Sequence, residues 1–369
     1  MRVTLWMASV ALLFGVLAAN LVPNGLASAD SATPLLARVT WSQPQRVLSG
    51  QFTGVSEVVD STNHVHIAVT GRGGVWYVTD RSGTWTQRRI LANLTNTEYV
   101  APSIALDEKD HVFIAVMRVP TTDVGDQGIY YVTDKGRARG SFPTSPTMIA
   151  PPDDGEPSLK VSHGHLFLAY VNGWCCVGDG EVQVRTNATG RWTVAHIARG
   201  QNPSLRVGSD GRPRVAFDSG WDPGIHYAVA ASASGRFSVT TVPGTDATDG
   251  TYLGPALALD LNNRPHIAWF GAGGIRYDWR SATGWHGPAR VATYQGVSYM
   301  AFDLDTLGRP NIVLGGRTMR HELLVGGAWH ETTVATQVDV AYVAIRRAFN
   351  GHTVIAWADN GGGIWLSRN

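Results

Sequence analysis

Short runs of apolar and polar residues, separated by turn residues about every eight to twelve positions, fill residues 253–292. The runs predict four strands, PALALD, PHIAWF, IRYDWR and WHGPARVA. Between them fall Asn262-Asn263, the glycine-rich stretch 271–274 and Thr283-Gly284. Short strands rich in β-branched and aromatic residues, with a turn after each, are typical of an antiparallel four-stranded unit.

An aromatic residue that marks the fourth strand recurs seven times, usually just after a glycine. The occurrences are about 44 to 57 residues apart, which is the length of one β-propeller blade. They are Trp41, Trp85, Phe142, Trp192, Phe237, Trp285 and Trp329. A small residue among large apolar neighbours in the second strand gives an independent count of seven: Ala68, Ala115, Ala169, Ala216, Ala268, Val313 and Ala356. A strand that is apolar on both faces is buried on both sides, so this column predicts stacked sheets.

The two markers are offset, and the offset predicts how the ring closes. Trp41 precedes the first alanine of the column, whereas no such aromatic follows Ala356. We therefore expect residues 343–369 to supply three strands of one blade and residues 38–48 its fourth, which removes the open edges. The sequence predicts an all-β, seven-bladed β-propeller that forms a single domain over residues 38–369.

The first 29 residues have the layout of a secretory signal. Arg2 is followed by the apolar stretch 3–19 and by the small-residue site 27–29. We predict cleavage there, a disordered leader over residues 30–37, and a secreted protein that is extracellular or at the cell surface. The apolar stretch is also long enough for a retained membrane anchor, and that alternative stays open.

Composition and charge exclude some classes of partner. The chain has 30 Lys and Arg against 29 Asp and Glu, and the counts become equal once Arg2 is removed with the signal. A neutral protein has no global field to attract nucleic acid or an anionic bilayer. No phosphate loop, nucleophile elbow, zinc-protease motif or Cys/His zinc spacing occurs, so we expect a monomer with no cofactor and no metal.

The innermost strands of a propeller surround an axial channel, and alternate residues of these strands should face it. The first such layer is small throughout and predicts an open channel mouth: Ser56, Ser103, Ser158, Ser204, Ala256, Ala301 and Ala344. The second layer holds three cations and one carboxylate: Val58, Ala105, Lys160, Arg206, Ala258, Asp303 and Arg346. Such a layer suits an anionic ligand such as a uronate or sialate. The alternative is a water-filled channel whose charges pair with one another.

The loops after the second strand are the most elaborate in three consecutive predicted blades, residues 100–150, 155–199 and 201–242. Their polar and aromatic residues include Arg118, Asp123, Asp126, Trp174, Asp179, Asp218, Trp221 and Asp222. A tryptophan ring stacks on a pyranose face while polar neighbours bind its hydroxyls. The alternative is that the tryptophans fill gaps between loops. We predict a ligand site made by Arg118, Trp174, Asp179, Trp221 and Asp222, with Lys160 from the channel.

The only two cysteines, Cys175 and Cys176, are adjacent in one of these loops. In an oxidising environment the pair closes as a vicinal disulfide or remains as thiols. A disulfide would staple the loop or present a flat surface beside Trp174. A redox-active pair is less favoured because such motifs space their cysteines by two residues.

Carboxylates are expected near the channel mouth, where Glu156 precedes an inner strand and Asp153 and Asp154 lie close by. A carboxylate pair there suits general acid and base catalysis. A calcium site and a solvated loop are the alternatives. The catalytic candidates are Glu156, Asp154, Arg206 and Arg346. His66 and His266 fall in second strands and are interpreted as hydrogen-bonded core residues.

The repeat P-S-[LI]-x-[LV]-D…G-R-P-x-[IV]-A resembles secreted bacterial propellers of the sialidase-like, BNR-repeat group. It stands in this chain as PSIALD from Pro102, PSLRVGSDGRPRVAF from Pro203 and LDTLGRPNIV from Leu304. That group carries an Asp box, Ser-x-Asp-x-Gly-x-Thr-Trp, as a structural turn between the third and fourth strands. Residues 78–85 keep its Asp, Thr and Trp but have Val78 for the Ser and Ser82 for the Gly.

The resemblance implies a glycan-related role, although the catalytic residues of the group's sialidases and lyases do not map onto this chain. We therefore predict a secreted propeller that recognises carbohydrate, or another small polar ligand, on the face made by these loops. One alternative is a glycan-active hydrolase or lyase of the same fold. The other is a protein-interaction scaffold at the cell surface, since fold alone does not define function.

Overall fold

The structure is a computed structural model that describes residues 39–122, 127–151, 154–173, 180–219, 222–245, 254–271, 273–293 and 296–369. Residues 39–369 form one compact unit. The described residues fold into 28 strands and no helix, so the protein is all-β as predicted. Among these residues, therefore, no helix is long and apolar enough to cross a membrane.

Antiparallel four-stranded sheets account for most of the strands. One sheet contains β2 (Phe52–Val59), β3 (Val65–Gly71), β4 (Gly74–Thr79) and β5 (Thr86–Ala92), and the next contains β6 (Thr97–Leu106), β7 (Val112–Pro120), β8 (Gly128–Thr133) and β9 (Thr147–Ala150). A third contains β22 (Val297–Leu304), β23 (Pro310–Gly316), β24 (Thr318–Val325) and β25 (Ala328–Thr336). Within each sheet every strand pairs with the next one along the chain, as the recurring turns predict.

One sheet has seven strands because a long strand belongs to two ladders. Its strands are β10 (Asp154–Ser162), β11 (His165–Asn172), β12 (Gly180–Thr186), β13 (Thr193–Val207), β14 (Pro213–Ser219), β15 (Gly224–Ala230) and β16 (Phe237–Thr241). The first part of β13, up to Gly200, pairs with β12, and the part from Gln201 onward pairs with β14.

The stretch predicted from residues 253–292 forms β17 (Ala256–Leu259), β18 (Pro265–Gly271), β19 (Gly274–Ser281), β20 (Gly284–Trp285) and β21 (Ala289–Ala292). The fourth strand predicted here is thus interrupted, and β20 and β21 both pair with β19. The backbone N–H groups of His286 and Gly287 turn to Asp278 Oδ1, at 3.1 and 2.5 Å, and Pro288 has no N–H to donate.

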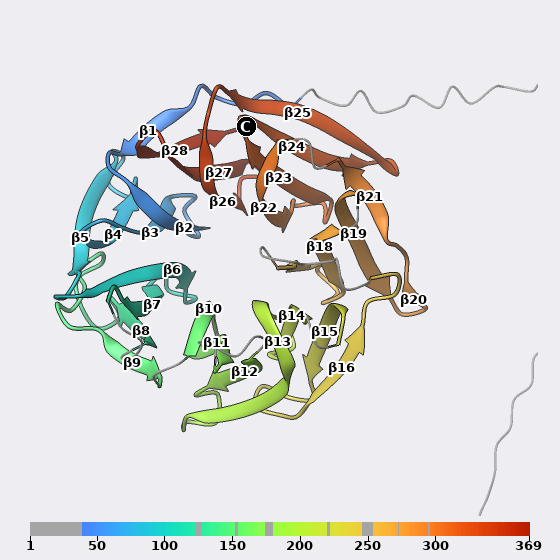
Figure 1. The fold of residues 1–369 in the computed structure, drawn as a ribbon, viewed down its shortest axis with the longest axis horizontal. Helices are drawn as coiled ribbons and strands as arrows, with labels where there is room; N and C mark the ends of the chain where they lie inside the picture. The colour runs from blue at the N-terminus through green and yellow to red at the C-terminus, as the bar shows by residue number, and fades with distance from the viewer. Residues whose placement is uncertain are drawn as a thin grey trace, which may run out of the picture. The chain divides into compact units, whose positions relative to one another are not determined.

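The remaining sheet joins the two ends of the unit, as predicted. It contains β26 (Val340–Arg347), β27 (Thr353–Asp359), β28 (Gly363–Arg368) and β1 (Gln45–Leu48), and β1 is antiparallel to β28. The first strands of the sheets lie side by side in the order β2, β6, β10, β13, β17, β22 and β26, and β26 returns to β2. The sheets therefore follow one another around a ring, which is the architecture of a β-propeller (Figure 1).

The core lies between neighbouring sheets. Every residue of the predicted small-residue column, from Ala68 to Ala356, is fully buried. Separate apolar clusters fill the spaces between successive sheets. One of them joins Val65 and Ile67 of β3 to Val354 and Ala356 of β27. The burial of this column confirms the prediction that both faces of each second strand are covered. The small side chains let adjacent sheets approach closely.

The serines of the inner strands link each sheet to the next. Each hydroxyl accepts the backbone N–H of the next inner strand, at 2.9 to 3.3 Å, in the pairs Ser56 with Ile104, Ser103 with Leu159, Ser158 with Leu205 and Ser204 with Leu257. Val58, Ala105 and Ala258 of the second predicted layer also pack into the clusters between sheets. Small and apolar side chains of the inner strands thus also contribute to packing between neighbouring sheets.

The degenerate box at residues 78–85 is a structural turn, as interpreted from the sequence. Asp80 Oδ1 accepts the backbone N–H of Val65 at 2.8 Å and ties the turn after β4 to the start of β3. Asp134 Oδ1 does the same for the N–H of Val112, at 2.7 Å, in the next sheet. These carboxylates are used by the fold and are not free for ligands.

Candidate functional site

The predicted ligand face is the end of the ring where second strands finish and inner strands begin. Arg118, Asp222 and Lys160 lie in the described part of the chain, as do Glu156, Asp154, Arg206 and Arg346. Five predicted site residues lie outside the described residues: Trp174, Cys175, Cys176, Asp179 and Trp221. The site below is therefore built from the described side chains.

Three inner strands bend sharply where they reach this face, and the first is β6, where Ala101 has a φ of 50°. Glu156 in β10 and Asn202 in β13 have φ angles of 56° and 53°, in the left-handed region that residues with a Cβ seldom adopt. Each precedes a proline, and the strand register shifts at each position. Glu156, expected just before its strand, instead lies in this bulge within β10. Bulges of this kind re-aim side chains beside functional sites.

The bend brings Glu156 and Asn202 into one hydrogen-bonded network with a buried carboxyl group. The backbone N–H of Asn202 donates to Glu156 Oε2. Asn202 Nδ2 donates to Asp218 Oδ1 at 3.0 Å, and Gln201 Nε2 contacts Asp218 Oδ2 at 3.4 Å. The network thus joins β10, β13 and β14, and we call Glu156, Gln201, Asn202 and Asp218 the acid network.

Asp218 is the titratable centre of the acid network. Burial raises its pKa to about 7; the Asn202 and Gln201 hydrogen bonds oppose the rise, and the nearby charge of Glu156 adds to it. Near neutral pH, Asp218 is therefore protonated in part of the molecules and is a carboxylate in the rest. A carboxyl group in that state donates or accepts a proton, and its two forms differ in what they bind.

Arg118 is fixed against the neighbouring sheet. Its guanidinium carbon lies 4.2 Å from the centroid of the Tyr130 ring, and Nη2 donates to the Tyr130 hydroxyl. This stacking holds a cation at the end of β7, where the predicted site needs one. Because this half-buried side chain is already ordered, it should lose little further conformational entropy when a ligand binds.

Asp222 presents a carboxylate to solvent from a fixed backbone. Its N–H donates to Ser219 Oγ at 3.1 Å, and its carbonyl oxygen accepts from His226 Nε2 at 2.7 Å. The carboxylate itself is 82% exposed. Asp154, in contrast, is fully buried and accepts from Asn172 Nδ2 at 2.7 Å, so it belongs to the local fold rather than to an exposed pair with Asp153, which lies outside the described residues.

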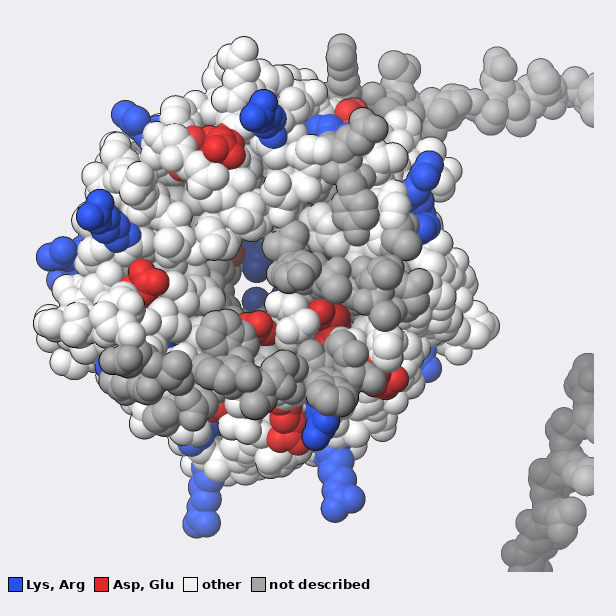
Figure 2. Space-filling view, in the orientation of Figure 1, with Lys and Arg blue, Asp and Glu red and all other residues white. Residues whose placement is uncertain are grey.

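The predicted charged layer has its own geometry. Lys160, Arg206, Asp303 and Arg346 occupy equivalent register positions on four inner strands, which sets them at one level around the axis. Figure 2 shows Lys or Arg atoms deep in the central opening. Burial, then the charges of Arg206 and Arg346, hold the pKa of Lys160 well below its usual range, while Asp303 opposes this. The layer therefore holds three basic side chains and one acidic side chain. One carboxylate cannot pair with all three basic groups, so these four residues alone do not neutralise one another.

The channel cations and the acid network are separate. Arg206 follows Asn202 by four residues in β13, which is roughly 13 Å along an extended strand. The structure thus brings Glu156 to Asp218 and brings Arg206 to Lys160 and Arg346, but it does not bring these two groups together.

Glu57 is an unexpected carboxyl group in the apolar layer between the sheets. It is fully buried, and neither carboxyl oxygen has a hydrogen-bonding partner of normal geometry. Burial raises its pKa to about 8; the charge of Arg346 opposes the rise, Asp303 adds to it, and Arg368 and the backbone N–H of Arg346 also oppose it. The equivalent positions on the other inner strands are all large and apolar: Ile104, Leu159, Leu205, Leu257, Phe302 and Ile345. When the repeats are aligned, Glu57 is the one acidic residue at a position that is otherwise apolar, and this is the sequence signal by which it could have been found.

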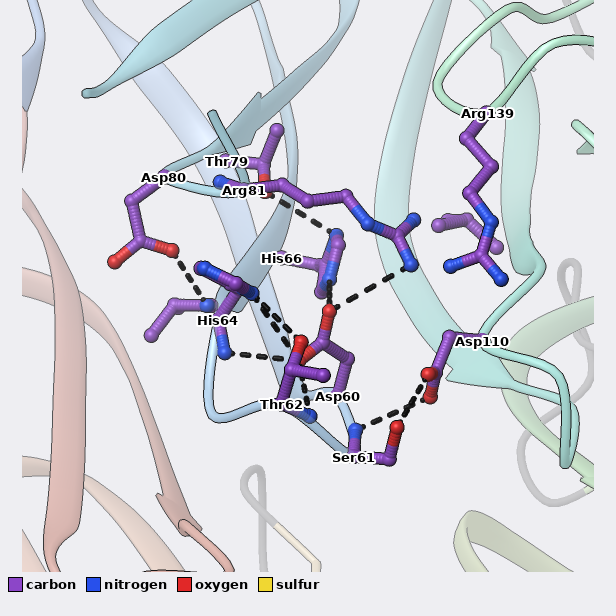
Figure 3. Close-up of polar contacts among 12 residues, drawn as sticks. Asp60, Ser61, Thr62, His64, His66, Thr79, Asp80, Arg81, Asp110 and Arg139 are labelled. Carbon is purple, nitrogen blue, oxygen red and sulfur yellow. Dashed lines mark hydrogen bonds and ion pairs between the residues drawn. The ribbon is translucent and has the colours of Figure 1, made fainter. Parts of the chain in front are cut away.

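The core histidines behave as interpreted from the sequence. His66 is fully buried, and its Nε2 lies 3.1 Å from Asp60 Oδ2 (Figure 3). Its Nδ1 lies 2.5 Å from the Tyr77 hydroxyl. His266 Nδ1 lies 2.6 Å from the Tyr277 hydroxyl in a second copy of the arrangement. Its recurrence in two sheets indicates a structural role. Across the described ranges, no three His, Cys, Asp or Glu side chains gather closely enough to hold a metal ion.

No protein-family model matches the chain, and no curated protein matches it by sequence. Solved β-propellers do match it in structure. The six-bladed fucose-binding lectin of Aleuria aurantia has 11% identity and a TM-score of 0.53, over 79% of this chain and 98% of the lectin. The polysaccharide lyase Uly1 has 13% identity and a TM-score of 0.53, over 86% of this chain and 89% of the lyase.

The Hadza microbial sialidase Hz136 has 9% identity and a TM-score of 0.50, over 88% of this chain and 68% of the sialidase. Likeness at such identities shows the fold alone. The chain is thus similar to propellers that bind or cleave glycans, and its own function has to be argued from its residues.

Proposed function

We propose that this protein is a carbohydrate-binding β-propeller whose site is the face holding the acid network, Arg118 and Asp222. The observation that carries the proposal is the acid network itself, which concentrates carboxylate and amide groups at two bent inner strands. Such groups bind sugar hydroxyls as paired donors and acceptors. The glycan-related structural neighbours agree with this class of ligand.

In this proposal each described side chain has a distinct role. Asp222 offers an exposed acceptor for hydroxyl groups, and Arg118 offers fixed donors to hydroxyl or carboxylate oxygens. Trp174 and Trp221 supply the apolar platform and Asp179 a further acceptor. Arg206 and Arg346 of the channel, with Lys160 beside them, favour a ligand with an anionic group, such as a uronate, where a chain end enters the channel.

A glycan-active hydrolase or lyase is the second candidate, and the pKa of Asp218 favours it. A carboxyl group that is partly protonated near pH 7 meets the requirement for a general acid, and Glu156 is the neighbouring carboxylate. In this case turnover, and not only binding, would require Asp218. Asp218→Asn should then abolish turnover while leaving glycan binding within a few-fold of wild type.

The test is binding of residues 30–369 to a broad glycan array, followed by turnover assays on every glycan that binds. An Arg118→Ala, Asp222→Ala double variant should lose at least about tenfold in affinity, because two charged hydrogen-bonding groups are removed. A Trp174→Ala, Trp221→Ala variant tests the aromatic platform. The control is Arg137→Ala, Asp339→Ala, which removes the same charges from exposed side chains in other parts of the ring.

Absence of binding to any glycan would refute the carbohydrate proposal. Pull-down of a protein partner by the same material would then support the interaction-scaffold alternative. Equal loss in the double variant and its control would show a nonspecific charge effect and would move the site away from this face.

We also infer seven blades, with the seven-stranded sheet counted as two four-stranded blades that share β13. The switch of β13 pairing at Gly200 and Gln201 supports this count. We further propose a monomer that is exported after cleavage near residue 29. The N-terminal mass of the protein from culture medium and from membranes distinguishes cleavage from a retained anchor.

A further inference from the structure

A cavity of about 570 Å³ lies at the opposite end of the sheets from the proposed carbohydrate site. It is lined by the end of β4, the turn into β5, the start of β5 and the loop between β8 and β9. It is therefore a groove between two neighbouring sheets. None of the roles described above uses it.

The cavity is rich in arginine. Arg81, Arg88 and Arg139 line it, and none of the described residues that line it is acidic. Figure 3 shows the Arg81 and Arg139 side chains converging from the two sheets, with their guanidinium groups facing one another. Arg81 has an acidic neighbour, Asp60, behind the cavity wall, but three guanidinium groups exceed that one carboxylate, so the arrangement favours an anion in the cavity.

Arg81 is held in place by an ion pair, but one of its guanidinium nitrogens lacks a hydrogen-bond acceptor among the described residues. Its Nη2 lies 3.7 Å from Asp60 Oδ2, an oxygen that also contacts His66 Nε2 at 3.1 Å. Its Nη1 is buried and has no hydrogen-bond partner among the described residues. A buried guanidinium N–H without an acceptor is costly, and an oxyanion in the cavity would supply the acceptor.

Arg139 and Arg88 complete the cation set from two other elements. Arg139 Nη2 donates to the carbonyl oxygen of Lys109 at 2.9 Å, which leaves its remaining N–H groups for a ligand. Arg88 lies opposite Tyr77 in the β4–β5 register, on the strand face toward the cavity. The Thr79 hydroxyl lies in the same wall, and the Ser82 hydroxyl there donates to the Thr84 carbonyl oxygen at 3.1 Å.

We propose that this cavity is a binding site for a tetrahedral oxyanion, a sulfate or a phosphate group, free or as an ester. Three planar guanidinium groups from three elements match an ion with several acceptor oxygens. A carboxylate has only two oxygens and would leave part of the donor set unused. The site is independent of the carbohydrate site.

The test is a calorimetric titration of the purified protein with sodium sulfate, sodium phosphate and sodium acetate at constant ionic strength. Wild type should bind sulfate or phosphate saturably at one site and acetate more weakly. An Arg88→Gln, Arg139→Gln double variant should lose at least about tenfold in affinity. Both side chains are exposed, so folding should survive.

The matched control is Arg89→Gln, Arg137→Gln. These exposed arginines lie on the same strand and in the same loop but do not line the cavity, and the variant has the same net charge. Tighter binding of galactose 6-sulfate than of sulfate would assign the site to an ester, and the reverse order would assign it to the free ion. Failure to saturate with any oxyanion, or equal losses in the two double variants, would overturn the proposal.

Discussion

At the scale of single residues, the most informative side chain is the one that breaks the repeat. Glu57 occupies a position that is apolar on every other inner strand, and its carboxyl group is buried without a hydrogen-bonding partner of normal geometry. A raised pKa means that the folded protein keeps the proton at pH values where the unfolded chain has released it. Stability should therefore fall as pH rises from the ordinary value of 4.5 to about 8, and stay level above it.

Replacing Glu57 with leucine should remove this pH dependence. One pKa unit corresponds to about 1.4 kcal/mol, so the wild-type loss between pH 4.5 and pH 8 should reach several kcal/mol. Glu57→Leu should thus be more stable than wild type at pH 8, and the difference should be small at pH 5. Urea unfolding at both pH values measures it. Glu98→Leu, at a half-buried position, is the control, and parallel profiles for wild type and Glu57→Leu would contradict the assignment.

The residue scale also shows where sequence reasoning reached its limit. The bond from Asn202 to Asp218 depends on a left-handed bend before Pro203, and no periodic pattern encodes the direction of a side chain at a bulge. The serines of the inner strands were visible in the sequence, but their partners depend on the radial stacking of the sheets. Residue types were therefore predictable, whereas contacts between sheets were not.

At the scale of elements, the turn signals and the alanine column predicted most strands correctly, because each depends on local alternation and burial. The exception is the interrupted strand after β19. There the buried carboxylate of Asp278 accepts the N–H groups of His286 and Gly287, and the following Pro288 has no N–H to continue the ladder. Closure of the ring by β1 was predictable for a different reason, since the offset between two markers carries topological information.

The closing strand gives a prediction of its own. Val47 and Leu48 of β1 are buried against the last sheet, whereas Gln45 and Arg46 are exposed. Val47→Asn with Leu48→Asn should cost several kcal/mol, because burial of each side chain contributes about 2 kcal/mol and a freed β28 edge invites association. Gln45→Asn with Arg46→Asn should change the melting temperature little. Thermal unfolding and gel filtration measure both, and equal melting temperatures would mean that β1 does not close the ring.

At the scale of the whole molecule, the ring brings charges from distant parts of the chain to one axis. Lys160, Arg206 and Arg346 come from β10, β13 and β26, and the field of the two arginines acts on the lysine. A lysine whose pKa lies well below 10.5 releases its proton in the folded protein at pH values where the unfolded chain still holds it. The stability of the fold should therefore fall as pH is lowered from 10.5 toward neutrality, opposite in direction to the effect of Glu57.

Lys160→Met tests this arrangement, because methionine keeps the length of the side chain and removes its charge. The variant should be more stable than wild type at pH 7, and the difference should shrink as pH approaches 10, where the unfolded lysine also loses its proton. Added salt should change the difference little, since charges inside the ring are poorly screened. Lys109→Met, on an exposed turn, is the matched control. A difference that is the same at pH 7 and pH 10 would mean that Lys160 keeps its proton, and the channel would then hold a stronger counter-charge than Asp303.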